Sequence, residues 1–516
     1  MRGCLPPNMG GQDCSLAGKK GNQSCVRGTD PKLLFDVTAL LITSTALGSA
    51  AEVSVAPAAT TISEIVPIES QAFALVHSAV PASDAGVPPV TITTASSLVD
   101  PGAIAHGIPI SVLEIPVSNP TEVRSLAGIS FVRGLAALSA SQIDKIVSDD
   151  PGVITKVLGA PPSAADVSTL WATLSPDTRS KLVATAPHLV GSLDGFPASV
   201  RNTANREWVS KSISSLKSKM SAVTGRVLAA SDQHTLDMLT KVDTALKPTK
   251  NGPTRTLLSV DPTGEGKAVI VLGNLQTADY VTYMVPGMFY TVDGQLGAWT
   301  GDAADLYKQQ VTWLHRLSTD DPSDAHKTVA VVAWMGYQTP DLTNIGSLAL
   351  ADTAKVTLTR DVEAMQAQRV DNPAFTTIIA HSYGSTAALM ALTDSQLTVN
   401  ALVLVGTPGS SAQSAKDLSV LNNNVWVGAA AWDPVTTSAF FGSDPSAQSY
   451  GAHKLGVGGG TDVITGKPLG QSIGHNEYFD PNTESIRNMA LVGIDQGGLV
   501  LRGDAADAHR TLTIAK

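Results

Sequence analysis

The sequence predicts an α/β protein: a mostly parallel, twisted sheet with flanking helices, preceded by a helical region. After Asn251, apolar runs of strand length alternate with helical stretches. The later runs are continuous and rich in β-branched residues, as expected for parallel strands covered on both faces. Strands that alternate with helices form such a sheet through right-handed crossovers. The 516 residues are enough for two or three domains and a sizeable core.

Seven apolar runs are predicted to be strands, and four stretches between or after them are predicted to be helices. The strands are Thr256–Val260, Ala268–Leu272, Tyr280–Val285, Val329–Trp334, Thr377–Ala380, Ala401–Val405 and Val425–Ala431. The helices are Ala303–Arg316, Ile345–Gln368, Ser385–Thr393 and Thr483–Val492. Residues 251–516 are therefore expected to form the main α/β domain.

Residues 121–250 are predicted to be a helical region, which could cap a site on the sheet. Ser163–Ala186 is expected to hold two short helices, the second opening near Ser175, and Arg201–Leu246 one or two long ones. Apolar residues also recur at three-residue spacing, as on one face of a helix. They are Leu126, Ile129, Val132, Leu135 and Leu138.

Residues 1–52 have the pattern of a weak export signal. Basic residues precede the apolar stretch Leu33–Ala50, and Ala50 or Ala51 could be a cleavage site. We expect a secreted or cell-envelope protein. The alternatives are a disordered extension or a first helix that packs on the body, which would leave the protein cytoplasmic. Residues 53–120 are rich in Val, Ala, Thr, Ser and Pro and are predicted to be a low-complexity arm or linker.

Charge and cysteine content exclude several classes of function. The formal charge is -10, with 45 acidic and 35 basic residues, and no Lys/Arg-rich run is present. A nucleic-acid partner is therefore disfavoured. No later stretch reaches about 18 uninterrupted apolar residues, which argues against an integral membrane domain. Cys4, Cys14 and Cys25 match no zinc-site spacing, and no cysteine nucleophile can exist after Cys25.

The segment Phe375–Leu389 has the pattern of a nucleophile elbow, small-x-Ser-x-Gly between a strand and a helix. Ser382 would sit on a strained turn with its hydroxyl above the sheet. The strand and helix backbones nearly touch there, so the residues two before and two after it must be small. Ala380 and Gly384 meet that requirement, although the first position is more often Gly. An ordinary strand-to-helix turn is the alternative interpretation.

A serine nucleophile needs a base and an acid that orients the base, and after an elbow the chain order is Ser, acid, His. Asp433 follows the last predicted strand, where the acid belongs, and His475 lies in a loop before a helix. We therefore predict the triad Ser382, Asp433 and His475. Asp444 and Asp480 are the fallback acids. His453 and His509 also follow Asp433, in a Gly-rich stretch and in the terminal tail. His381 is expected to point away from the reacting face.

The oxyanion of a tetrahedral intermediate needs two backbone N–H donors. We predict Tyr383, which follows the nucleophile, as the first. The second is expected from the turn after the third strand, where Pro286-Gly287 is followed by Met288. A plain turn is the alternative there.

These residues together resemble a known family. Val285-Pro-Gly-Met288, Trp334-Met-Gly-Tyr337, the Ala-His-Ser-Tyr-Gly-Ser segment ending at Ser385, and Gly474-His-Asn-Glu-Tyr-Phe479 resemble the actinobacterial α/β-hydrolases once filed as a domain of unknown function. The resemblance covers about residues 170–494, including the helical segment Leu193–Arg206. It implies an α/β-hydrolase fold with a Ser-Asp-His triad. The family tends to have Gly in place of Ala380 and Asp in place of Gln338.

The predicted function is a serine hydrolase of the carboxylesterase or lipase-like kind, acting on a small-molecule ester or lipid-like substrate. No metal or organic cofactor is implied, and no dinucleotide motif follows the first strand. Two alternatives stay open. A peptidase or amidase would use the same triad, and a non-catalytic cell-envelope binding protein would keep only the scaffold.

Overall fold

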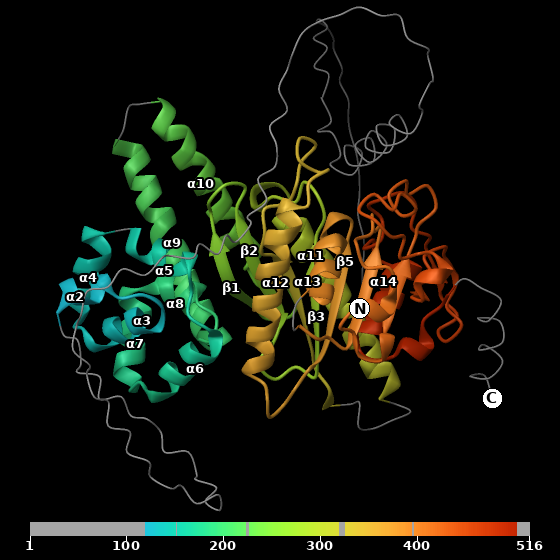
Figure 1. The fold of residues 1–516 in the computed structure, drawn as a ribbon, viewed down its shortest axis with the longest axis horizontal. Helices are drawn as coiled ribbons and strands as arrows, with labels where there is room; N and C mark the ends of the chain where they lie inside the picture. Colours follow the sequence, from blue (N-terminus) through green and yellow to red (C-terminus); the bar gives the residue numbers. More distant parts are fainter. Residues whose placement is uncertain (1–118, 151, 223–225, 319–325, 395–396, 503–516) are drawn as a thin grey trace, which may run out of the picture.

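The computed structural model describes residues 119–150, 152–222, 226–318, 326–394 and 397–502 (Figure 1). The predicted leader, almost all of the low-complexity arm, the three cysteines and His509 lie outside these ranges. In the described part of the chain, no helix has the length and apolar character needed to cross a membrane.

An eight-stranded sheet forms the centre of the described chain. Its strand order is β1-β2-β4-β3-β5-β6-β7-β8. β2 runs antiparallel to both of its neighbours, and every pair from β4 to β8 is parallel. The strands are β1 Arg255–Asp261, β2 Lys267–Gly273, β3 Tyr280–Val285, β4 Val329–Met335, β5 Phe375–His381, β6 Ala401–Val405, β7 Val425–Gly428 and β8 His453–Lys454. A separate two-stranded ribbon pairs β9 Gly460–Thr461 with β10 Pro468–Leu469.

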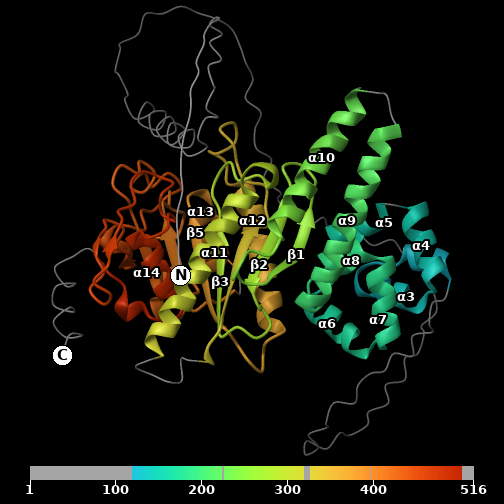
Figure 2. The same cartoon turned by 180° about the vertical axis from the view of Figure 1, so that it is seen from behind.

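Helices cover both faces of the sheet, as the continuous apolar strands require. α11 (Val292–Leu317) and α14 (Glu484–Gly493) pack over one face, where Trp299, Trp313 and Ile486 join one buried core. α12 (Ala349–Ala367) and α13 (Tyr383–Asp394) pack over the other face and contribute to a second core. The two faces are seen in Figures 1 and 2.

The α/β prediction is confirmed, with three corrections of extent. α12 begins at Ala349 rather than Ile345. α11 begins at Val292 rather than Ala303, because Thr291 caps its N-terminus and the buried Leu296 and Trp299 hold the first turns on the core. The run predicted as a strand to Ala431 leaves the sheet at Gly428. Ala431 instead forms an isolated bridge with Ile473.

Nine helices precede the sheet in the described chain. They are α2 Pro120–Ser125, α3 Gly128–Ala137, α4 Ala140–Asp149, α5 Gly152–Gly159, α6 Ala164–Thr173, α7 Pro176–Thr185, α8 Pro187–Ser192, α9 Ala198–Ala222 and α10 Arg226–Ala245. The two short helices at Ser163–Ala186 are confirmed, with Ser163 and Ser175 as N-caps. The three-residue repeat from Leu126 to Leu138 does not form one helix. Leu126 ends α2 in extended backbone, and Leu138 lies beyond the end of α3.

The helical region packs beside the β1 edge of the sheet (Figures 1 and 2). The fully buried Asn205 of α9 donates to the carbonyls of Leu257 and Leu258 in β1, and α10 packs on α11. These contacts fix the region against the side of the sheet. Its predicted role as a cap over the site stays a prediction.

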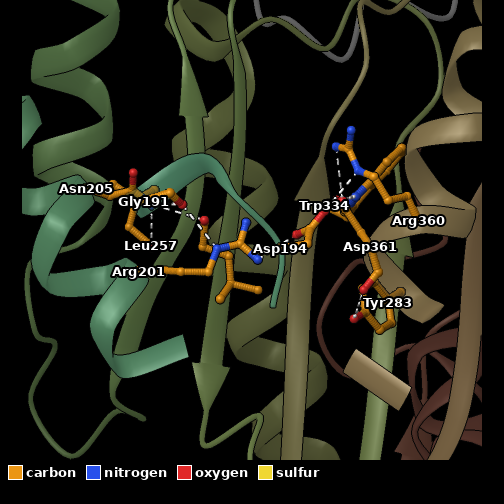
Figure 3. A network of polar contacts seen from close by, with 10 residues as sticks. Gly191, Asp194, Arg201, Asn205, Leu257, Tyr283, Trp334, Arg360 and Asp361 are labelled. Atoms are coloured by element: carbon orange, nitrogen blue, oxygen red, sulfur yellow. Dashed lines mark hydrogen bonds and ion pairs between the residues drawn. The ribbon is translucent and has the colours of Figure 1, made fainter. Parts of the chain in front are cut away.

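A network of charged side chains joins the helical region to α12 (Figure 3). Asp194 accepts from Arg201 Nη1 at 2.7 Å and from Arg360 Nε at 2.9 Å. Next to it, Asp361 accepts from the indole nitrogen of Trp334 at 2.8 Å. Burial and the neighbouring Asp194 charge raise the pKa of Asp361 to about 6. This network is the charged part of the contact between the two regions.

Candidate active site

Ser382 lies on a sharp turn between β5 and α13. Its φ is +55°, in the left-handed region that is costly for a residue other than Gly. Its N–H donates to Val405 O of the neighbouring strand at 3.0 Å, which helps to hold the turn. A Cβ at Gly384 would lie 2.2 Å from Pro286 O, so only Gly fits there. Ala380 is fully buried and pairs with Val285, so its methyl group is accommodated within the sheet.

The structure brings the three predicted triad residues together. His475 Nε2 lies 2.8 Å from Ser382 Oγ, and His475 Nδ1 lies 2.9 Å from Asp433 Oδ1. An ionised carboxylate only accepts, so Nδ1 carries the proton and Nε2 accepts from the serine hydroxyl. All three residues are buried, each at most 6% exposed. The three side chains thus form one hydrogen-bonded chain from Ser382 through His475 to Asp433.

Two loops hold the acid and the base next to each other, although Asp433 and His475 are 42 residues apart in the sequence. The loop after β7 carries Asp433, and the loop before α14 carries His475. The loops meet where Ala431 bridges Ile473 and where Gly474 N–H donates to Ala431 O at 2.8 Å. The departure of the chain from the sheet at Gly428 thus places Ala431 where it can pair with the histidine loop.

Asp433 is held in its ionised form by its neighbours. Burial favours the neutral acid, but three features outweigh it and lower the pKa of Asp433: the charge and hydrogen bond of His475, the Tyr478 hydroxyl and the Val435 N–H. The Tyr478 hydroxyl donates to Oδ2 at 2.6 Å, and Val435 N–H donates to Oδ1 at 2.9 Å. A charged Asp433 can fix the tautomer of His475 and stabilise its cation.

Tyr478 is a site residue that the sequence reasoning did not identify. Its hydroxyl donates to Asp433 and accepts from Ala430 N–H at 2.9 Å, so it ties the acid to its own loop. Burial raises the pKa of Tyr478 well above its ordinary value, so the hydroxyl keeps the proton that it donates. The signal available in the sequence was its place in the Gly474–Phe479 motif, three residues after the histidine.

His381 contacts the base rather than the nucleophile. Its Nε2 lies 2.7 Å from the backbone carbonyl of His475, so Nε2 carries the proton and donates. Burial and the nearby His475 lower the pKa of His381 to about 3. The ring is therefore neutral at ordinary pH, and it supports the histidine loop without adding a charge beside His475.

The segment Pro286–Met288, predicted to supply an oxyanion donor, approaches the nucleophile closely. A Cβ on Gly287 would lie 2.4 Å from Ser382 Cβ, so the backbone can pass the serine only because residue 287 is Gly. The Tyr337 hydroxyl donates to Pro286 O at 2.7 Å and anchors the turn. Met288 is buried, and Tyr383 begins α13 directly after Ser382. Their roles as amide donors stay a prediction.

The other candidates lie in different settings. The carboxylate of Asp444 accepts from the backbone and hydroxyl of Ser446 in its own turn. His453 forms part of β8, with its ring 4.8 Å from that of Trp426. Gln338 accepts from Glu265 N–H and donates to Thr263 O, and these bonds hold the β1–β2 turn. Within the described residues, no group of three or more His, Cys, Asp or Glu side chains could hold a metal ion.

Residues 261–443, from the end of β1 past the predicted acid, match the protein family described as Alpha/beta hydrolase. The match includes the elbow, and the mostly parallel sheet with its flanking helices agrees with it. The fold is the α/β-hydrolase fold.

The chain is also similar to two uncharacterized proteins of Mycobacterium tuberculosis, from strains CDC 1551 / Oshkosh and ATCC 25618 / H37Rv. Each is 27% identical over 65% of this chain and 56% of the relative, so the chain spans about half the length of the curated relatives it matches.

Solved structures of esterases also align with this chain. An esterase/lipase from an uncultured bacterium is 8% identical with a TM-score of 0.29, covering 56% of this chain and 98% of its own. The esterase of Pyrobaculum calidifontis is 13% identical with a TM-score of 0.30, covering 55% and 97%.

Proposed function

We propose that the protein is a serine hydrolase that cleaves carboxylic esters through an acyl-enzyme on Ser382. The observation that carries the proposal is the continuous hydrogen-bonded chain from Ser382 Oγ through His475 to Asp433 and Tyr478. Such a chain can raise the nucleophilicity of a serine and stabilise the imidazolium that forms.

In the proposed mechanism, His475 Nε2 takes the proton of Ser382 as Oγ attacks the ester carbonyl. The carbonyl oxygen becomes an oxyanion, which the backbone N–H groups of Tyr383 and Met288 would stabilise. His475 then gives its proton to the leaving alcohol, and the acyl group remains on Ser382. A water molecule, deprotonated by His475, attacks the acyl-enzyme and releases the carboxylic acid. Asp433 stays ionised throughout.

The choice of esters over amides is tested with matched substrates. We expect p-nitrophenyl butyrate to be hydrolysed far faster than the corresponding p-nitroanilide, and Ser382→Ala to abolish both reactions. Ser214→Ala, at an exposed serine of α9, is the control and should keep the wild-type rate. Preferential cleavage of the anilide would favour the peptidase or amidase alternative. No cleavage of either substrate by the folded protein would favour the binding-protein alternative.

A further inference from the structure

Trp432, next to Asp433, combines two features that each cost free energy. Its side chain is 88% exposed, and its backbone φ is +63°. A bulky residue in the left-handed region is strained, and an exposed indole leaves a large apolar surface in water. The left-handed φ belongs to a tight turn in which Asp433 N–H donates to Ala430 O at 3.3 Å and Trp432 is the third residue, a position where Gly would carry the least strain. Their occurrence one residue from the triad acid points to a role at the site.

Ile473 lies on the neighbouring loop, two residues before His475, and is 46% exposed. The bridge between Ala431 and Ile473 sets the two loops side by side, so Trp432 follows directly from the paired position. Two exposed apolar residues thus flank the acid and the base from adjacent backbone segments. We name Trp432 and Ile473 together the apolar lip.

Exposed apolar side chains are concentrated at this edge of the described molecule. Ten large apolar side chains are exposed in the described residues, and five of them lie on the loops after β4, after β7 and before α14. The five are Leu342, Leu348, Trp432, Phe440 and Ile473. β4 and β7 run parallel to β5, so the loops that follow them begin at the edge where Ser382 projects. Ligands of open α/β sheets bind at that edge.

The charges on the loops at this edge limit the chemical class of ligand that can bind there. Residues 286–291, 336–348, 429–452 and 470–482 contain no Lys or Arg, and five carboxylates lie among them. An anionic substrate group would meet no Lys or Arg in these four segments and would be repelled by their acids. The loop after β6, which begins at the same edge, carries one lysine, Lys416. A neutral ester with a hydrocarbon chain fits both the apolar residues and the lack of positive charge.

We propose that the apolar lip binds the hydrocarbon chain of a neutral carboxylic ester and makes the protein prefer longer aliphatic acyl chains to acetate. The inference rests on the proposed function, since the lip would position the chain beside Ser382. Each methylene group that leaves water is worth roughly a fourfold gain in binding, so partial coverage of several methylenes gives about tenfold.

The test compares p-nitrophenyl octanoate with p-nitrophenyl acetate, both below their solubility limits. We expect Trp432→Ala to lower the ratio of the two kcat/KM values about tenfold, mainly through KM for octanoate. Trp432→Phe should restore most of the ratio. Val356→Ala is the matched control, because Val356 is 62% exposed on α12, and it should keep the wild-type ratio. If the ratio of the two kcat/KM values in Trp432→Ala stays within twofold of the wild-type ratio, the proposed role of the apolar lip is wrong.

A binding measurement keeps the lip testable apart from catalysis. In the Ser382→Ala background, titration calorimetry with p-nitrophenyl octanoate should show binding that weakens about tenfold when Trp432→Ala is added. Equal affinity with and without Trp432, or no octanoate binding to the parent variant, would contradict the lip. Normal lip-dependent binding without any turnover by the wild type would instead contradict the proposed function alone.

Discussion

Two networks each contain a buried or partly buried aspartate, and they shift the pKa of that aspartate in opposite directions. Asp433 has a fully buried side chain, yet its pKa is lowered. The Asp361 side chain is 17% exposed, yet its pKa is raised to about 6. Burial raises the pKa of both carboxyl groups, so burial alone does not set the direction of the net shift. The arrangement of donors and neighbouring charges does.

The partners explain the difference. Three groups donate to Asp433 at 2.6 to 2.9 Å, and each favours the ionised form. Asp361 has one short hydrogen bond, from Trp334, and a long contact of 3.5 Å with Arg360, while the charge of Asp194 opposes its ionisation (Figure 3). The first network holds Asp433 in its ionised form. The second fastens the helical region to α12.

The largest expected effect is a loss of activity when the network around Asp433 is changed. Asp433→Asn keeps the shape of the side chain but no longer requires the proton of His475 on Nδ1. We expect kcat/KM for ester hydrolysis to fall by about 10⁴ while the fold is kept. The measurement is steady-state kinetics together with circular dichroism. Activity near that of the wild type would remove Asp433 from the mechanism.

In the second network the largest effect should be on stability. Asp194→Asn leaves Arg201, which is 7% exposed, without its charged partner. Breaking a buried pair in this way costs about 3–5 kcal/mol of the free energy of unfolding. Urea denaturation measures this cost, and kcat/KM of the folded protein should change little. Asp243→Asn, at an exposed ion pair, is the control. If Asp194→Asn loses no more free energy of unfolding than Asp243→Asn, the network around Asp194 does not stabilise the contact between the helical region and α12.

The raised pKa of Asp361 predicts a pH dependence of stability. The folded state keeps a proton on Asp361 up to about pH 6, whereas the unfolded chain releases it near 3.8. The proton on Asp361 therefore contributes its full stabilisation of the folded state below pH 3.8. The free energy of unfolding falls by up to about 3 kcal/mol as the pH rises through 6. Asp361→Asn should remove this part of the pH dependence in urea denaturation series at pH 4, 5, 6 and 7. Identical curves for variant and wild type would contradict the assignment.

The smallest effect is expected from Tyr478→Phe, which removes one donor to Asp433. A hydrogen bond to a charged group is worth about 1.5–3 kcal/mol, so stability should fall by that amount and kcat/KM should fall less than in Asp433→Asn. Tyr450→Phe is a matched control, since the buried Tyr450 hydroxyl has no hydrogen-bond partner among the described residues. Equal stability of the two variants would show that Tyr478 does not support the acid.

The sequence predicted the parts that depend on local pattern. Parallel strands could be located because both faces are buried, and the elbow could be located because its small residues lie next to Ser382 in the chain. The order of acid and base followed from the elbow, and the structure places His475 beside Ser382 and Asp433 beside His475. The charged network, by contrast, joins residues up to 167 positions apart, Asp194 and Asp361, whose types are ordinary in the sequence.

Three features that the sequence analysis missed have identifiable physical causes, two of them local and one long-range. The first turns of α11 contain Gly294, Gly297 and Gly301, which weaken any helical prediction, but the packing of Trp299 overrides that cost. The repeat from Leu126 to Leu138 is interrupted at Gly128, which has a φ of +55°. Tyr478 could not be assigned, because its contact with Asp433 depends on the pairing of two loops far apart in the chain.

Labelling with a fluorophosphonate probe tests most directly whether Ser382 is an activated nucleophile. The wild-type protein should gain one covalent adduct, and peptide mass spectrometry should locate it on Ser382. Ser382→Ala should remain unlabelled. A wild-type protein that stays unlabelled, or an adduct that persists in Ser382→Ala, would contradict the account.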